Sequence, residues 1–252
     1  MLEIKLIALV FVIQWLVFIP AYAFKTERYY DLTGSLTYTS VMVIALLAVD
    51  SLTLRTVLLA ALVIIWSLRL GLFLFSRISA AGGDSRFEQI KIAPLRFFKV
   101  WTLQAVWVTF TAAAALLAMT SNQQAPFGAI TALGVLLWVL GFAIEVIADQ
   151  QKSRFRSNPD NANAFISTGL WSFCRHPNYF GEIWLWVGIA LIALPVLEGW
   201  RVVGLLSPVF VALLLIRGSG IPLLERAAEE KWGSTEAYQQ YKASTPRLFP
   251  GY

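Results

Sequence analysis

The stretch Cys174-Arg175-His176-Pro177-Asn178-Tyr179-Phe180-Gly181-Glu182 carries the densest group of polar side chains in a strongly apolar chain. It runs directly into Ile183-Trp184-Leu185-Trp186-Val187-Gly188, which has the composition of a membrane segment. Pro177 has no backbone N–H and a fixed φ, so it suits the first position of a helix and disfavours helical geometry at His176. The stretch therefore predicts a transmembrane helix that begins at Pro177 and has a polar cluster at its N-terminal end.

The polar side chains of this predicted helix share one face. Asn178 and Glu182 are four residues apart, so they lie one turn above each other, and Tyr179 is beside them. Ionisable groups at membrane depth are costly and usually functional, and the only histidine of the chain, His176, is in the same stretch. The spacing also fits a second interpretation, a membrane-edge cluster that reaches the interface and binds no ligand.

The composition indicates a polytopic membrane protein. Of the 252 residues, 58% are hydrophobic and only 14% are charged, which excludes an ordinary soluble domain. The net charge of +5 comes from basic residues in short loops between apolar stretches, so it indicates membrane orientation and gives no support to nucleic-acid binding. One cysteine and one histidine are too few for a disulfide framework or for a cysteine- or histidine-rich metal centre. We expect no metal site.

The apolar stretches predict an all-α protein with seven transmembrane helices in a single domain over residues 1–252, without internal repeats. A polar stripe, with Glu145, Asp149 and Lys152 on one helix face, is predicted to continue the fifth helix beyond the membrane. An amphipathic tail follows the seventh span, with Gly233 in a C-cap position and a second short helix over residues 235–241. The predicted spans are residues 6–24, 36–49, 56–76, 97–119, 127–147, 177–197 and 202–216.

Basic residues are concentrated in loops 77–99 and 153–175 and in the tail, whereas the intervening loops hold few, chiefly Arg55 and Arg201. The positive-inside rule therefore predicts a cytoplasmic C-terminus and an N-terminus on the outer side. With this topology the stretch 175–182 and the tail face the cytoplasm together.

The polar residues predicted to face the cytoplasm suit a charged, nucleotide-like cofactor. Arginines bind phosphates, acids and amides bind ribose hydroxyls or a carboxamide, and aromatic rings stack on a flat heterocycle. A Walker loop is absent, and one Gly-Gly pair is too weak for a Rossmann fingerprint. The candidates are Arg69, Asp84, Arg86, Asp149, Lys152, Arg175, His176, Asn178, Tyr179, Glu182, Glu225, Tyr238 and Tyr241.

Taken together, these motifs resemble the bacterial branch of the steroid 5-alpha-reductase family, its DUF1295 branch. The resemblance is strongest over residues 140–252. The matching motifs are Trp66–Gly71, Gly83–Phe87, Asp149–Lys152 and Arg175–Glu182, followed by Glu225, Trp232-Gly233, Tyr238, Tyr241, Thr245-Pro246 and Pro250. The broader superfamily also contains sterol reductases and isoprenylcysteine carboxyl methyltransferases, which share the Arg-His-Pro-x-Tyr-x-Gly pattern.

The resemblance implies a reductase of the bacterial inner membrane that transfers hydride from NADPH to the conjugated C=C bond of a 3-oxo-Δ4-steroid or similar lipid enone. It places the cofactor mainly on residues 140–252 and the hydrophobic substrate mainly on the N-terminal half. By position, Asn178, Tyr179 and Glu182 would hold the nicotinamide and ribose, and Asp149 the diphosphate–ribose region. Phosphate contacts would come from Arg69, Arg86 and Arg175.

In the eukaryotic steroid reductases an acid and a tyrosine polarise the 3-keto oxygen. Here the counterpart of the tyrosine is Trp66, which departs from the family pattern, and the counterpart of the acid is Asp31. Asp31, Trp66 and Tyr179 are thus the implied catalytic residues. Two other readings stay open: a SAM-dependent methyltransferase of the isoprenylcysteine type, and a membrane binding protein or transporter without enzymatic activity.

Overall fold

The computed structural model describes residues 1–249 except for the side chain of Ser85, so Pro250 of the sequence motif lies outside the described residues. Every regular element in these residues is a helix, and no strand occurs among them. The long helices are α1 (Leu2–Ala23), α2 (Tyr30–Ala48), α3 (Leu54–Ala81), α4 (Pro94–Thr111), α5 (Ala113–Met119), α6 (Ala129–Ser157), α7 (Pro177–Ala193), α8 (Ser207–Arg217), α9 (Ile221–Trp232) and α10 (Glu236–Ser244). Short 3-10 helices connect them: η1 (Ser85–Phe87), η2 (Pro159–Asn161), η3 (Gly169–Ser172), η4 (Leu194–Val196) and η5 (Gly199–Leu206).

Among the described residues, six helices are long and apolar enough to cross a membrane, and α4 with α5 makes a seventh span if the bent pair is counted as one. The chain is therefore a multi-pass membrane protein, as the sequence predicts. Helix α7 begins at Pro177 as expected, and α6 continues past Asp149 and Lys152 to Ser157. Helix α9 ends at Trp232 with Gly233 as its C-cap.

The fourth predicted span, residues 97–119, is not one straight helix. It is bent by 53° between α4 and α5. At the bend the Ser207 hydroxyl donates a hydrogen bond of 2.9 Å to the carbonyl of Thr111. A hydroxyl inserted at a helix carbonyl is a recognised cause of sharp kinks, and apolar periodicity does not reveal it.

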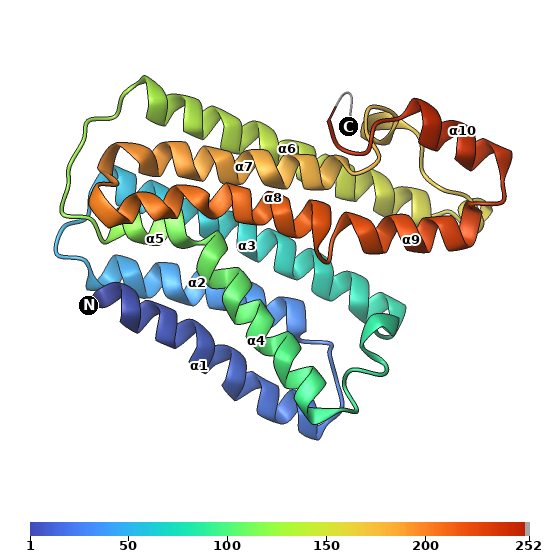
Figure 1. Ribbon diagram of the computed structural model, residues 1–252, viewed down its shortest axis with the longest axis horizontal. Helices are drawn as coiled ribbons and strands as arrows, with labels where there is room; N and C mark the ends of the chain where they lie inside the picture. The colour runs from blue at the N-terminus through green and yellow to red at the C-terminus, as the bar shows by residue number, and fades with distance from the viewer. Residues whose placement is uncertain (250–252) are drawn as a thin grey trace. The chain divides into compact units, whose positions relative to one another are not determined.

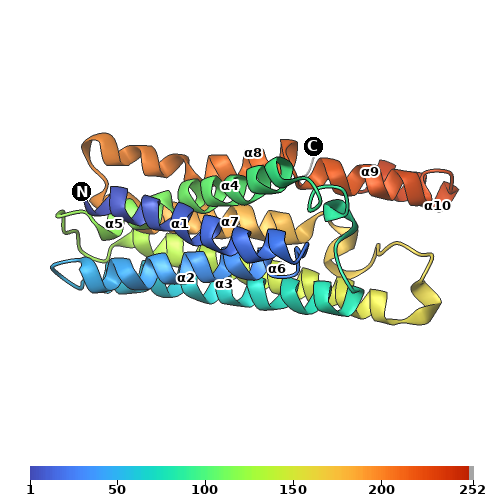
Figure 2. The same ribbon diagram turned by 90° about the horizontal axis from the view of Figure 1, so that it is seen from below.

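Contacts divide the chain into two compact units. Unit 1 comprises Met1–Phe127 and Ile192–Ser207. In it α2 packs along α3, and α1 packs on α4 and α2 (Figures 1 and 2). An aromatic cluster in which Phe97 and Trp101 are fully buried fixes the end of this unit where α4 begins, and Phe87 of η1 packs into it. Edge-to-face aromatic pairs such as Phe97 and Trp101 contribute about 0.5–1.5 kcal/mol each beyond the area that they bury.

Unit 2 comprises Gly128–Leu191 and the chain from Pro208 onward, and its helices α6, α7 and α8 run side by side (Figure 1). Four glycines bring the backbones of α6 and α7 into contact: a Cβ on Gly141, Gly181 or Gly188 would meet backbone atoms of the facing helix at less than 3.0 Å. Gly134 provides the carbonyl that faces Gly188. Small residues at such seams let membrane helices approach closely, so van der Waals contact can hold them together.

Candidate functional site

The site is built at the start of α7 in unit 2. The carbonyl of His176 accepts the first helical bond, from the N–H of Phe180 at 3.1 Å, so the preceding residues lie just outside the helix. Pro177 needs no acceptor at this position because it has no N–H. The N–H of Arg175 donates to the carbonyl of Pro246 at 3.0 Å, which ties this turn to the tail.

Glu225 of α9 joins the two basic residues of this turn. Its carboxylate lies 3.1 Å from Arg175 Nη2 and 2.7 Å from His176 Nε2. The side chains are largely buried, with 9% of Arg175, 6% of His176 and 16% of Glu225 exposed. Arg175 Nη1 also donates to the carbonyl of Lys242 in α10 at 2.9 Å. These contacts fasten both tail helices to the start of α7.

Burial lowers the pKa of His176 below its ordinary value of 6.5, although the hydrogen bond with Glu225 acts in the opposite direction. The imidazole is therefore neutral near pH 7 and has one N–H. Since the carboxylate of Glu225 can only accept, that N–H is on Nε2, and Nδ1 carries a lone pair. Nδ1 is thus a hydrogen-bond acceptor.

Asn178 connects α7 to α6. Its Nδ2 donates to Asp149 Oδ1 at 3.2 Å, which assigns the other end of the amide, Oδ1, as an acceptor. Asp149 is buried, with 5% of its surface exposed. The polar stripe predicted on the fifth span therefore meets the polar face of the sixth, as two antiparallel helices with complementary faces do.

Three buried polar atoms of this turn have no hydrogen-bond partner within residues 1–249: Arg175 Nε, His176 Nδ1 and Asn178 Oδ1. One is a donor and two are acceptors, by the assignments above. Buried polar groups in native proteins are nearly always satisfied, by protein, water or ligand. Water, or a ligand with donors and acceptors such as a ribose or a carboxamide, would satisfy these atoms.

A family model described as a protein of unknown function, DUF1295, matches residues 17–245 of the chain, from within α1 to the residue after α10. The chain belongs to the DUF1295 family. An uncharacterized protein of Schizosaccharomyces pombe is 26% identical over 226 residues, which are 78% of this chain and 63% of that protein. The chain thus spans less than two thirds of this relative's length. No solved structure matches it significantly.

The other predicted residues of unit 2 surround this turn of the DUF1295 chain. Tyr179 stacks on His176 with ring centroids 5.9 Å apart and planes 15° apart. Glu182 is buried one turn further into α7. On the facing helix Glu145 is more deeply buried, with 1% exposed, and its backbone contacts Gly181. Sequence reasoning noted Glu145 on the polar stripe and did not include it among the site residues.

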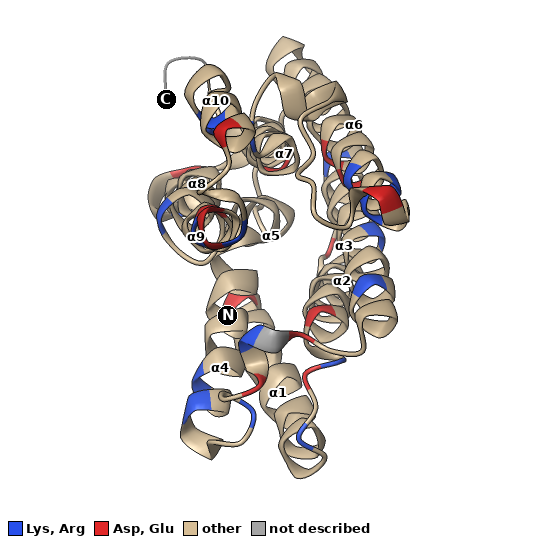
Figure 3. Ribbon diagram, turned by 90° about the vertical axis from the view of Figure 1, so that its right-hand side faces the viewer, with Lys and Arg blue, Asp and Glu red and all other residues tan. Residues whose placement is uncertain are grey.

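A second layer of unit 2 is organised by Trp171, which the sequence analysis missed. Its indole N–H donates to the carbonyl of Ala148 at 3.1 Å, and its own carbonyl accepts the Tyr241 hydroxyl at 2.6 Å. The Lys152 ammonium lies 4.4 Å from its ring centroid. Tyr238, 3% exposed, packs against Phe165. The only sequence signal for Trp171 is a tryptophan in a polar loop. Figure 3 shows charged residues on α6, α9 and α10.

The remaining predicted residues belong to unit 1. Asp84 and Arg86 form an ion pair in the loop after α3, in which Arg86 Nε lies 2.9 Å from each carboxylate oxygen of Asp84. Asp31, in the first turn of α2, lies close enough to Arg77, Arg86 and Asp84 to interact electrostatically.

Trp66 is buried in α3 with its ring edge-on to Tyr38, at a centroid distance of 5.2 Å. Asp31 is about two turns from Tyr38 along α2, roughly 10 Å. The two residues implied to polarise one oxygen are therefore at different levels of unit 1. The phenol of Tyr38 is a hydrogen-bond donor that the sequence analysis did not consider. Arg69, also in α3, has its guanidinium 5.3 Å from the ring centroid of Phe73.

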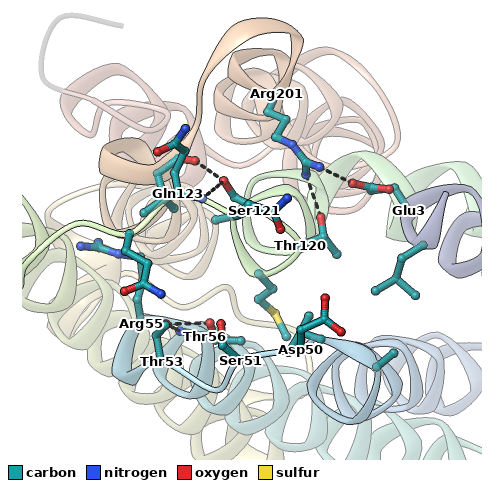
Figure 4. A pocket seen from close by; sticks show the side chains of 18 of the residues that line it. Glu3, Asp50, Ser51, Thr53, Arg55, Thr56, Thr120, Ser121, Gln123 and Arg201 are labelled. Carbon is teal, nitrogen blue, oxygen red and sulfur yellow. Dashed lines mark hydrogen bonds and ion pairs between the residues drawn. The ribbon is translucent and has the colours of Figure 1, made fainter.

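Unit 1 also contains a polar pocket of about 280 Å³ where α2 ends and α3 begins, opposite the end of α3 that leads to Asp84 (Figure 4). On one wall Arg201 pairs with Glu3 at 2.7 Å and donates to Thr120 Oγ1 at 2.9 Å. On another, Arg55 donates to the carbonyls of Ile192, Ala125 and Pro126 at 2.6–3.1 Å. Since both guanidinium groups tie helix ends together, we assign no ligand to this pocket.

Proposed function

We propose that this DUF1295 chain is an NADPH-dependent membrane reductase that adds hydride to the conjugated C=C bond of a lipid enone, such as a 3-oxo-Δ4-steroid. The observation that carries the proposal is the set of three unsatisfied atoms on Arg175, His176 and Asn178, beside the buried acids Asp149 and Glu182. The resemblance of residues 175–182 and of the tail to the bacterial steroid 5-alpha-reductases supports it.

The residues of unit 2 fit the nicotinamide–ribose end of the cofactor. His176 Nδ1 and Asn178 Oδ1 would accept hydrogen bonds from ribose hydroxyls or from a carboxamide N–H₂, and Arg175 Nε would donate to an oxygen. Glu182, one helical turn into α7, adds a further acceptor. NADPH, when bound, supplies the hydride. The protein's own residues orient the ring, exclude water and hold the substrate.

Hydride addition to an enone places negative charge on the carbonyl oxygen, so a donor at that oxygen lowers the barrier. The resemblance assigns this task to Asp31 and Trp66. The indole N–H of Trp66 is a donor and has no acceptor function. We propose Tyr38 as an additional donor, because its ring packs edge-on against the ring of Trp66. A proton must also reach the adjacent carbon, and Tyr179 is our candidate for that step.

The proposed topology puts the start of α7 and the tail in the cytoplasm, where NADPH is available. It follows from the basic residues of loops 77–99 and 153–175. We expect a reporter fused to the C-terminus to be active only if it functions in the cytoplasm. Activity of a reporter that works only outside the cytoplasm would contradict the placement of the site.

The cofactor is tested by thermal unfolding of the purified protein in detergent with NADPH or SAM. A ligand that binds only the native state at about 100 times its Kd stabilises it by about 2.7 kcal/mol. We expect NADPH to raise the midpoint and SAM to leave it unchanged. Stabilisation by SAM alone would favour the methyltransferase reading, and no response to either would favour a binding protein.

Catalysis is tested with Glu182→Gln, assayed with NADPH and a 3-oxo-Δ4-steroid. Glutamine keeps the shape of the side chain but presents an N–H₂ where an acceptor is needed. We expect a folded protein that loses most enone reduction, and Tyr179→Phe should show a milder loss. Wild-type rates in a folded Glu182→Gln protein would contradict the assignment of Glu182 to the cofactor.

A further inference from the structure

The hydrogen-bonding role of His176 is set by one neighbour in unit 2, the carboxylate of Glu225. Its Oε1 lies 2.7 Å from His176 Nε2, and its Oε2 lies 3.1 Å from Arg175 Nη2. An ionised carboxylate can only accept hydrogen bonds, so it holds the ring proton on Nε2 and leaves a lone pair on Nδ1. Nδ1 has no partner within residues 1–249. Glu225 therefore makes His176 present an acceptor to the occupant of the site.

The imidazole ring is held in one orientation. Tyr179 stacks on it with ring centroids 5.9 Å apart and planes 15° apart. The carbonyl of His176 accepts the N–H of Phe180 at 3.1 Å, which fixes the backbone of His176 to the first turn of α7. Because the ring plane and the contact at Nε2 are both fixed, the direction of Nδ1 is fixed as well. Only the position of the ring proton then decides whether Nδ1 accepts or donates.

A second acid sets the role of Asn178 in the same way. Asp149 Oδ1 accepts a hydrogen bond from Asn178 Nδ2 at 3.2 Å, so the remaining amide atom, Asn178 Oδ1, is an acceptor. Each of the two acceptors, His176 Nδ1 and Asn178 Oδ1, requires a donor such as a ribose hydroxyl or a carboxamide N–H₂. An ionised carboxylate or phosphate has acceptors only and would place its oxygens against these lone pairs.

We propose that Glu225 is the positioning residue that determines the specificity of this site: it holds His176 in the Nε2–H tautomer, so that Nδ1 accepts a hydrogen bond from a hydroxyl or amide donor of the cofactor. The inference rests on the proposed function and needs only residues of unit 2. Glu225 contributes to cofactor binding through His176.

Glu225→Gln should reverse the role of His176. The guanidinium of Arg175 can only donate, so it takes the amide oxygen, and the amide N–H₂ then faces His176 Nε2. Arg175 cannot change its role, whereas a neutral histidine can carry its proton on either ring nitrogen. Nε2 therefore accepts, the proton lies on Nδ1, and the acceptor of the site becomes a donor.

The first test reads the tautomer by nitrogen-15 NMR, because His176 is the only histidine of the chain. Labelled histidine in the detergent-solubilised protein gives the two ring nitrogens of this residue alone. Burial lowers the pKa of His176 below 6.5, so the ring is neutral at slightly alkaline pH. Nε2 is two bonds from both ring C–H protons and Nδ1 from only one, so their couplings distinguish them.

We expect the wild type to carry its proton on Nε2. NADPH should shift the Nδ1 signal, because the lone pair then accepts a hydrogen bond, and should leave Nε2 protonated. A proton on Nδ1 in the wild type overturns the proposal. So does an unchanged Nδ1 signal in wild-type protein that binds NADPH.

The second test compares Glu225→Gln with Glu229→Gln. Glu229 is a matched control because it lies one turn further along α9, and its carboxylate pairs with Lys242 at 2.7 Å and accepts from Gln239 at 3.1 Å, both in α10. We expect Glu225→Gln to carry its proton on Nδ1 and to raise the Kd for NADPH about tenfold, as loss of one buried hydrogen bond would produce. Glu229→Gln should keep the wild-type tautomer and Kd.

A double variant separates the tautomer from a general disturbance of the tail. Adding Arg175→Leu to Glu225→Gln removes the guanidinium that claims the amide oxygen, so this oxygen can accept from Nε2 again. We expect the Nε2–H tautomer to return. A merely structural effect of Glu225→Gln is not reversed by a second change in the same contact, so a proton that stays on Nδ1 overturns the proposal.

The outcomes also separate this inference from the proposed function. A folded Glu225→Gln protein that keeps the Nε2–H tautomer, or that switches it and binds NADPH as the wild type does, overturns the positioning role alone. An equal loss of affinity in Glu229→Gln assigns the effect to tail docking and overturns it too. If Glu225→Gln does not fold, the wild-type spectra with and without NADPH still decide. If the wild type does not bind NADPH, the proposed function fails and this inference fails with it.

Discussion

Replacing Gly181 with alanine tests the glycine seam between α6 and α7 that supports the start of α7. The new Cβ would lie against the carbonyl oxygen of Gly141 and 2.7 Å from the backbone N of Glu145. Real Cβ atoms essentially never approach other heavy atoms below 3.0 Å. Because both neighbours are backbone atoms of a long helix, they cannot rotate away, and the two helices must separate.

Two opposing terms set the magnitude of this change. Alanine gains about 1 kcal/mol over glycine in a helix interior. Overpacking a close contact costs about 1–3 kcal/mol and more where backbone must move. Separating the helices also loosens the packing at Gly141 and Gly188, which lie on the same seam. We expect the cost to exceed the gain, for a net destabilisation of about 1–2 kcal/mol.

The assay is thermal unfolding in detergent, followed by tryptophan fluorescence. For a chain of this size 1 kcal/mol corresponds to about 2–4 °C, so we expect Tm to fall by roughly 2–8 °C. Gly34→Ala is the matched control: Gly34 is inside α2, and its Cβ would meet only the end of the Gln104 side chain, at 2.7 Å. That amide can move, so Tm should stay or rise. A folded Gly181→Ala protein as stable as Gly34→Ala would refute the reasoning.

Three further predictions concern single charged residues. Glu225→Gln removes a largely buried ion pair with Arg175 and should destabilise the docked tail by about 2 kcal/mol. The loss should appear as faster proteolysis and faster hydrogen exchange of α9 and α10. The control is Glu230→Gln, which removes an exposed ion pair and should change stability by under about 0.5 kcal/mol. Glu27, in the loop between α1 and α2, accepts the backbone N–H of Asp84 at 3.0 Å. The pKa of Glu27 is lowered on folding, so the contribution of its ionised form to stability is fully present above pH 4.5 and is lost as pH falls through the folded-state pKa. The difference in unfolding free energy between the wild type and Glu27→Gln should therefore shrink between pH 7 and pH 3. Arg55→Met removes the donor that three backbone carbonyls share. The unfolding free energy, measured by denaturant titration, should fall by about 2–4 kcal/mol. A fall of less than about 1 kcal/mol would contradict the role of Arg55 in holding these helix ends together.

The sequence by itself determined the membrane class and most of the helices. Bilayer hydrocarbon offers no partners to backbone groups, so a long apolar stretch must form a helix wherever it crosses. Pro177 fixed the start of α7 for the equally local reason that it has no N–H. Gly233 marked the end of α9, although its backbone is right-handed there and does not form the left-handed cap that glycine usually provides. The spacing of Asn178 and Glu182 likewise placed their side chains one turn apart before any tertiary contact was known.

Only the tertiary structure decided which polar residues meet. Three contacts join residues that are distant in sequence: the hydrogen bond between Asn178 and Asp149, the ion pair between Glu225 and Arg175, and the hydrogen bond from the Asp84 N–H to Glu27. The sequence pattern also did not reveal the bend at Thr111, because that bend involves the hydroxyl of Ser207, far away in the chain. Nor did it reveal the glycine contact between α6 and α7, because that contact requires the facing helix. Periodicity reports which face of a helix is polar, because that depends on neighbours along the chain. The partner of that face depends on how helices pack, and packing is set by backbone approach and side-chain shape across the whole unit.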